Sequence, residues 1–463
     1  MMIKLEKTFL VSIYLLFTII FCNFLINLFF NSSFLASINV NLYDIFSGLV
    51  LFIFLFFMGR AIQKYFKISN TSFSIVIYLF SFFLVDTIIL FAYKDFSFNE
   101  VFVITNLLWI LTLLLNEESR KYLLSGVTFY LFHNYFFEMN NTLLSKNLNI
   151  LGDVEAVFFE QSKNIYENSY YFSVNNFVME GYPQFISYFQ SLFLKFSSIQ
   201  GTYDFYSFTS HIVFYLSILF FLELNISKKN KIFLCSLFSV IIFNSSWLQF
   251  LFTTSLMSEG LVSLLTVITL YHVLRNLKNN NYELLFALTS YGLIYFSKQF
   301  NSFITVISVL IFYLIFKKIN IIIFGLSGLI FKELLYSFVF LSVKKDHHIR
   351  QIDVIDTFID IVLFRDLKIE NIIEILSNLW IDKPISLIFA IFYLSFLYLI
   401  IFNKNLELFK VSSFLIINLN FLMVFTLYVS VWQNMELESP IRYFLNYFHL
   451  MLVFIFISLE KEK

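Results

Sequence analysis

Charged residues are scarce in this chain of 463 residues, at only 13% of the total. A soluble domain has about a quarter of its residues charged, so the shortage argues against a soluble protein. Lysine plus arginine number 31 and aspartate plus glutamate number 31, which gives a formal net charge of zero. This balance offers no basic surface that would favour a nucleic-acid partner.

Cysteine, proline and glycine are scarce as well. The two cysteines, Cys22 and Cys235, lie in apolar stretches and provide neither a disulfide framework nor the spacing of a metal site. Three prolines and ten glycines leave no flexible linker that would divide the chain. Walker and His-Glu-x-x-His motifs are missing, which argues against ATP hydrolysis and zinc proteolysis.

Long apolar runs make up most of the sequence. Hydrophobic residues reach 59% and the mean hydropathy is +0.80. Runs of about 15–25 apolar residues fit helices that cross a hydrocarbon core about 30 Å thick. We therefore predict an all-α, polytopic transmembrane helix bundle of about fourteen spans, the first of them a retained helix and not a cleaved signal peptide. The spans are expected near 9–30, 42–59, 72–92, 101–115, 122–137, 205–224, 231–248, 251–274, 283–297, 302–316, 319–342, 385–402, 409–431 and 443–459.

Lysine and arginine gather in alternate connections between these spans, which predicts the orientation of the chain. The connection 31–41, for example, has no basic residue, whereas the next contains Arg60, Lys64 and Lys67. Because the alternation continues along the whole chain, both termini are expected in the cytoplasm. The expected location is the bacterial inner membrane. The long polar intervals 140–204 and 342–384 then lie on the extracytoplasmic side.

The first of these intervals contains two amphipathic segments. Asp153 and Glu155 open a stretch with apolar residues at helical spacing, and Pro183 begins a second stretch over 184–198. Both stretches are short and polar enough to lie in the membrane interface as helices. The alternative is that Asp153 and Glu155 only stabilise a helix N-terminus, where negative charge suits the helix dipole.

Ionisable residues inside the predicted spans are few and cluster toward the outer half of the membrane. They indicate an outward-facing polar cavity, because a charged group in hydrocarbon costs about 2.5–3.5 kcal/mol on insertion scales. The alternative is that the histidines are hydrogen-bonded packing residues. The set expected near the outer side is Asp86, His133, His211, Glu259, Lys332, Glu333 and His449, whereas His272 is expected at the cytoplasmic end.

Several short motifs in this order resemble the GT-C superfamily of membrane glycosyltransferases. They are Gly152-Asp153-x-Glu155 and Gly181-Tyr182-Pro183 in the first long loop, Glu259 near the outer end of a helix, Lys298, and Pro440-Ile441-Arg442-Tyr443. Members of this superfamily include protein mannosyltransferases and aminoarabinose transferases, which use polyprenyl-phosphate sugars. The resemblance is closest over 122–342, which would be the GT-C-like module with its catalytic loop at 140–204. Residues 1–121 would be additional helices, and 343–463 an outer amphipathic loop with C-terminal spans.

The resemblance implies a role for each candidate residue. Asp153 would act as the general base on an acceptor hydroxyl, with Glu155 as the second choice. Cations would stabilise the departing lipid phosphate. The residues assigned to substrate binding are Lys298, Lys344, Lys345, His347, His348, Arg350, Arg442, Glu259 and Tyr182.

The expected partners are a polyprenyl-phosphate sugar donor, membrane lipid, and a glycan, lipid or protein acceptor. No cofactor is expected. Acidic residues could hold a divalent cation, but no ligand cluster argues for one. A flippase for lipid-linked oligosaccharides and an O-antigen polymerase or ligase are the alternatives. Few glycines and prolines and no internal repeat argue against a transporter. The cations at 344–350 leave a polymerase or ligase open; the alternatives for this cluster are a solvated charge run at a helix end and a contact with anionic lipid.

Overall fold

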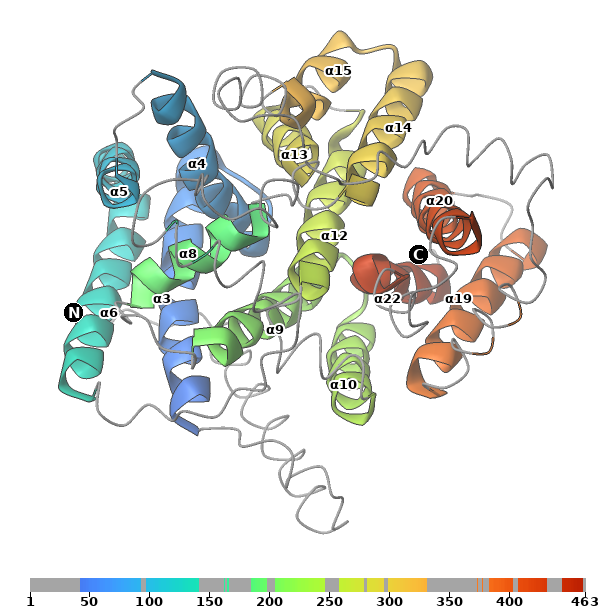
Figure 1. The fold of residues 1–463 in the computed structure, drawn as a ribbon, viewed down its shortest axis with the longest axis horizontal. Helices are drawn as coiled ribbons and strands as arrows, with labels where there is room; N and C mark the ends of the chain where they lie inside the picture. Colours follow the sequence, from blue (N-terminus) through green and yellow to red (C-terminus); the bar gives the residue numbers. More distant parts are fainter. Residues whose placement is uncertain are drawn as a thin grey trace.

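Helices make up all the regular structure that the computed structural model describes (Figure 1). The all-helical fold expected from the sequence is thus confirmed within those residues. The described residues are 42–92, 97–140, 162, 165, 185–197, 205–245, 258–278, 281–294, 299–330, 373, 377, 383–402, 407–430 and 444–460.

Every span predicted from residue 42 onward overlaps an observed helix, and the span near 9–30 lies outside the described residues. The helices are α3 (Leu42–Phe66), α4 (Thr71–Ala92), α5 (Phe98–Leu114), α6 (Glu117–Asn140), α8 (Phe185–Ser197), α9 (Phe205–Glu223), α10 (Lys228–Asn244), α12 (Ser258–Asn276), α13 (Tyr282–Leu293), α14 (Gln299–Phe316), α15 (Ile319–Gly325), α19 (Lys383–Phe402), α20 (Leu408–Ser430), the short 3₁₀ turn η4 (Leu445–Tyr447) and α22 (Phe448–Leu459).

Within the described residues, two helices are by themselves long and apolar enough to cross a membrane. Their apolar windows are Pro384–Ile401 and Leu408–Phe425. A third span is possible if Leu51–Phe66 and Thr71–Asp86, which meet at 98°, count as one broken span. Other apolar helices are shorter: at about 1.5 Å per residue, the 12 residues of α13 reach about 18 Å. The number of crossings therefore stays a prediction.

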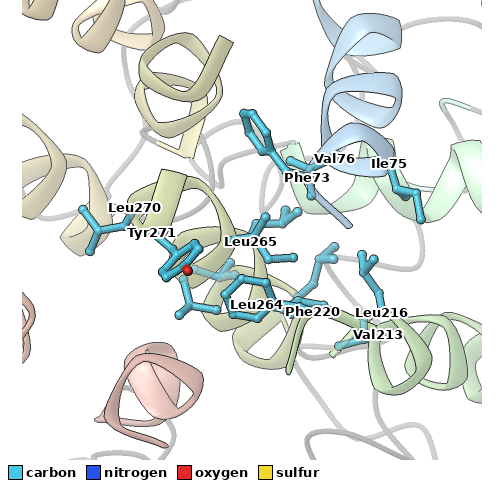
Figure 2. Close-up of a cluster of buried hydrophobic side chains, with 14 of the residues drawn as sticks. Phe73, Ile75, Val76, Val213, Leu216, Phe220, Leu264, Leu265, Leu270 and Tyr271 are labelled. Carbon is cyan, nitrogen blue, oxygen red and sulfur yellow. The ribbon is translucent and has the colours of Figure 1, made fainter. Parts of the chain in front are cut away.

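The core is built around α12, which lies between the group α3–α6 and the C-terminal helices α19, α20 and α22 (Figure 1). α3 packs against α4, α6 and α9, so helices before and after residue 121 share one core. Figure 2 shows its centre, where apolar side chains of α4, α9 and α12 meet. The labelled members are Phe73, Ile75, Val76, Val213, Leu216, Phe220, Leu264, Leu265, Leu270 and Tyr271.

Polar side chains inside the helices hydrogen-bond mainly to their own helix. Ser217, Ser239, Thr269 and Ser308 each donate to the carbonyl four residues earlier, at 2.7–2.9 Å. A hydroxyl that bonds its own backbone needs no water. This pattern of hydrogen bonds suits helices in hydrocarbon, where an unsatisfied polar group costs several kcal/mol.

Leucine and isoleucine side chains are exposed on the outward faces of several helices. Leu111 is 63% exposed on α5, Leu124 58% on α6, and Leu394 63% on α19. Soluble proteins rarely present apolar patches of this extent. These faces suit contact with lipid, in agreement with membrane association.

Connections that the charge pattern assigns to one side of the membrane contact one another. Lys64 at the end of α3 lies 3.6 Å from Glu118 at the start of α6. The ammonium of Lys318 donates to the carbonyl of Leu277 at 2.8 Å. The amide of Ser227 donates to Glu460 at 3.0 Å. The basic connections therefore form one continuous end of the molecule; the side of the membrane that it faces stays a prediction.

Candidate functional site

Most of the candidate site residues lie outside the described residues, so their roles stay predictions. Of the candidate substrate-binding residues, the structure describes only Glu259, in the first turn of α12, and that by its backbone alone. His133 in α6 and His211 in α9 are likewise described by their backbone alone. The residues outside are Asp153, Glu155, Tyr182, Lys298, Lys344, Lys345, His347, His348, Arg350 and Arg442, and also Lys332 and Glu333.

Helix α8 lies within the predicted catalytic loop, where a helical stretch was expected over 184–198. Tyr188 and Leu192 are completely buried, as are their neighbours Phe189 and Phe193. Rings on this face pack against α4: Phe189 lies 5.6 Å from Phe80 between ring centroids. α8 is thus docked on the bundle, where it also contacts α6 and α9.

A second point of the loop is fixed to α8 by buried hydrogen bonds. Ser162 is helical and 1% exposed, and its hydroxyl donates to the amide oxygen of Gln190 at 2.7 Å. The hydroxyl of Ser191 donates back to the carbonyl of Ser162 at 2.7 Å. Ile165, helical and buried, belongs to the apolar face predicted after Glu155. Ser162 and α8 are therefore joined directly.

Asp86 lies on α4 near this docking point and is buried, with 4% exposure. Burial raises the pKa of the Tyr188 hydroxyl well above its usual value, and the Asp86 carboxylate raises it further. The Tyr188 hydroxyl therefore stays protonated close to the ionisable side chain of Asp86. Two of the polar residues predicted to lie toward the outer side have described side chains, Asp86 and His449, and Asp86 lies near Tyr188 of α8.

His449 is a packing residue, which resolves the two alternatives for this histidine. Its ring joins Ser217 of α9 to Ser263 of α12. The Ser217 hydroxyl uses its proton on the carbonyl of Val213, at 2.7 Å, so it accepts from Nε2 of His449 at 2.9 Å. Ser263 Oγ accepts the backbone N–H of His449 at 3.0 Å and lies 2.9 Å from Nδ1, to which it donates. This pattern assigns the proton to Nε2 and satisfies both ring nitrogens.

A polar cluster that sequence reasoning did not predict caps the start of α4. We call it the α4 cap; its members are Ser69, Thr71, Ser72, Glu223, His272 and Glu283. The two carboxylates come from the end of α9 and the start of α13.

Glu223 accepts the backbone N–H groups of Thr71 and Ser72, each at 2.8 Å, and the Ser72 hydroxyl at 2.6 Å. The first N–H groups of a helix have no partner within it, and the dipole makes this end positive, so a carboxylate is favoured there. The α4 cap thus ties the start of α4 to the end of α9.

Glu283 accepts three further hydrogen bonds in the α4 cap. Ser69 donates its hydroxyl at 2.6 Å and its backbone N–H at 3.3 Å. Nδ1 of His272 donates at 2.7 Å, and the His272 ring stacks on Phe73 with centroids 4.2 Å apart. His272 was expected at the cytoplasmic end, and here it lies among the basic connections.

The α4 cap has the residue types of a Ser-His-Glu triad but not its geometry. In such a triad the serine bonds the histidine, whereas Ser69 here bonds the carboxylate. Burial alone would raise the pKa of Glu283, but the hydrogen bonds from His272 and Ser69 outweigh it and lower this pKa to about 2. The carboxylate therefore stays ionised and weakly basic at neutral pH, which suits a joint between helices and not a general base.

Signals for the α4 cap were present in the sequence. Ser69-Asn70-Thr71-Ser72 is rich in helix-capping residues just before an apolar run. Its partners Glu223 and Glu283 are distant along the chain, so local pattern could not pair them. Within the described residues, no group of three or more His, Cys, Asp or Glu side chains is placed to hold a metal ion.

Comparison with known proteins gives no relative for this chain. No protein-family model matches it, and no match was found among curated proteins or solved structures.

Proposed function

We propose that the protein is a GT-C-like membrane glycosyltransferase. It transfers a sugar from a polyprenyl-phosphate donor to a glycan, lipid or protein acceptor on the extracytoplasmic face of the bacterial inner membrane. About fourteen spans cross that membrane, with both termini in the cytoplasm. The observation that carries the proposal is the buried hydrogen bond that joins Ser162 of the predicted loop to Gln190 of α8.

A transferase loop must hold its base in a fixed place, because misplacement of a catalytic group by about 1 Å can cost 10²-fold in rate. Two supports serve this purpose here. The hydrogen bonds of Ser162 fix the chain at a point that follows Asp153 and Glu155 in the sequence. The buried face of α8 anchors the segment that follows Pro183.

The chemistry assigned to the loop is proton removal from the acceptor hydroxyl. Asp153, or in its place Glu155, accepts this proton as the hydroxyl attacks the anomeric carbon of the donor sugar. The bond from that carbon to the lipid phosphate breaks, and the phosphate leaves as an anion. Cations from Lys298, the 344–350 cluster and Arg442 stabilise it. Asp86, beneath α8, is a further ionisable group at this side of the bundle.

The test is a transfer assay on the purified protein in lipid nanodiscs with a panel of radiolabelled polyprenyl-phosphate sugars. The variants are Asp153→Asn and Glu155→Gln. Glu167→Gln, a carboxylate of the same loop, is the matched control. We expect one of the first two variants to lower the rate by 10²–10⁴-fold, the usual contribution of a general base. The control should stay near the wild-type rate.

Undiminished transfer in both variants would refute the role of these two carboxylates. Tight binding of every donor without any turnover by the wild type would refute the transferase itself and favour a lipid-linked oligosaccharide flippase. Formation of long polymers from a lipid-linked repeat unit would instead indicate an O-antigen polymerase.

A further inference from the structure

A hollow of about 570 Å³ opens at the basic end of the molecule, between the end of α3 and the turn from α5 to α6. The proposed transferase does not use this place, which borders the α4 cap through the hydrogen bonds of Gln63 with Ser69 and Thr71. The residues that line it are Arg60, Gln63, Lys64, Lys67, Ile68, Asn116, Glu117 and Glu118.

Arg60 is held in the wall of this hollow by three neighbours. Its guanidinium donates to the amide oxygen of Gln63 at 2.6 Å. The guanidinium carbon lies 5.7 Å from the ring centroid of Tyr122 and 6.0 Å from that of Phe56, within the range of cation–π contacts. A guanidinium that is already oriented loses little freedom on binding, and its planar fork matches the oxygens of a phosphate.

The charges of the hollow favour an anion. Three cations line it against two carboxylates, and both carboxylates are near lysines. Glu118 lies 3.6 Å from Lys64, and Glu117 lies 3.8 Å from Lys121. Lys67, directly after α3, has a φ of 55°, a left-handed conformation that a lysine rarely adopts. This conformation ends α3 at the wall of the hollow and leaves a third cation there.

Exposed leucines lie next to the lining residues along the chain. Leu115, next to Asn116 in the α5–α6 turn, is 77% exposed. Leu111 on α5 and Leu124 on α6 continue the apolar surface away from the turn. A soluble phosphorylated compound would contact the cations but would leave this apolar surface exposed, whereas a lipid would cover both.

We infer that the hollow binds the phosphate head group of an anionic phospholipid, with the acyl chains along the exposed leucines of α5 and α6. Such a site at the basic end agrees with the attraction of lysine and arginine to anionic lipid at a membrane surface. It differs from a general surface attraction because Arg60 is oriented by Gln63 and Tyr122. The inference requires membrane insertion but does not depend on the transferase activity.

The test is retention of phosphatidylglycerol by the full-length protein, measured by native mass spectrometry after extraction from nanodiscs of phosphatidylcholine with increasing phosphatidylglycerol. The variant is Arg60→Gln/Lys67→Gln. The matched control, Lys228→Gln/Lys229→Gln, removes two charges from another basic connection. We expect the variant to weaken retention about fivefold for each cation removed. The control should retain the lipid as the wild type does.

The comparison with the control and several further measurements distinguish this site from its alternatives. Equal losses in the variant and its control would overturn the site in favour of a diffuse charge effect. Displacement of the lipid by inorganic phosphate at similar concentration would overturn it in favour of a soluble phosphate ligand. Arg60→Lys, which keeps the charge but not the fork, should retain the lipid with intermediate affinity. Thermal unfolding of every variant shows whether a loss of lipid merely reflects a loss of fold.

Discussion

Glu283 shows how a residue that looks ordinary in the sequence can join distant helices. It begins α13, yet it accepts hydrogen bonds from Ser69 before α4 and from His272 in α12. His449 is the opposite case, since its place in an apolar helix drew attention and both of its ring nitrogens proved to be occupied by serines. At this scale, function cannot be assigned from residue type alone; the partners decide it.

Glu283→Gln should destabilise the protein by about 1–3 kcal/mol, because a partly buried network that loses its charged acceptor leaves donors poorly satisfied. The control is Glu117→Gln, whose side chain is 81% exposed and whose ion pair with Lys121 at 3.8 Å is worth little. The measurement is thermal or denaturant unfolding of both variants in the same detergent. Equal stability of the two would contradict the role given to the α4 cap.

The same carboxylate predicts a pH dependence. The pKa of Glu283 is lowered from 4.5 to about 2, so folding favours its ionised form. Its contribution to the free energy of unfolding is complete above pH 4.5 and is lost as the pH falls toward about 2. The stability difference between wild type and Glu283→Gln, measured from pH 7 down to 3, should therefore shrink with falling pH. A constant difference would show that this carboxyl group titrates alike in the folded and unfolded chains.

At the scale of helices, the sequence predicted where each helix lies far better than which helices pack together. Each apolar run predicted as a span from residue 42 onward overlaps a described helix, because the length of an apolar run is a local property of the sequence. The helix α8 was likewise predicted from the spacing of residues such as Tyr188 and Leu192. What could not be foreseen is the 98° angle between Leu51–Phe66 and Thr71–Asp86, since it depends on where Gln63 and Glu223 hold the connection.

Close packing of α13 on α15 gives a prediction for an element. A β-carbon built on Gly292 would lie 2.6 Å from the carbonyl oxygen of Gly325, whereas one on Gly126 would lie 3.3 Å from the β-carbon of Phe57. Backbone cannot move away as a side chain can, so Gly292→Ala should destabilise by about 1–3 kcal/mol. Gly126→Ala should cost clearly less. Unfolding midpoints of the two variants in one detergent make the comparison, and the reverse order would contradict this packing.

For the whole molecule, the contacts among basic connections accord with the alternation read from lysine and arginine. The contact of Lys318 with Leu277 and that of Ser227 with Glu460 bring together parts that lie far apart along the chain. A missed helix would have placed some of these connections at opposite ends. The orientation in the membrane is a separate matter, and it can be measured.

Tyr170→Cys, in a background with Cys22 and Cys235 replaced by serine, should react with a membrane-impermeant maleimide added outside intact cells. Lys229→Cys in the same background should react only after the membrane is opened, because it lies in a connection assigned to the cytoplasm. The measurement is the labelled fraction before and after permeabilisation. Labelling of residue 170 only after permeabilisation would invert the proposed topology and place the loop away from its donor.

The sequence by itself determined that the chain is helical and apolar, where its helices lie, and which connections are basic. These properties follow from hydrophobic length and local charge, which act over one or two turns of a helix. Only the tertiary structure decided that Glu223 and Glu283 cap α4, that His449 is a packing residue, and that Arg60 lines a hollow beside exposed leucines. Each of these depends on a partner that lies far away in the sequence, and such partners meet only when the helices pack.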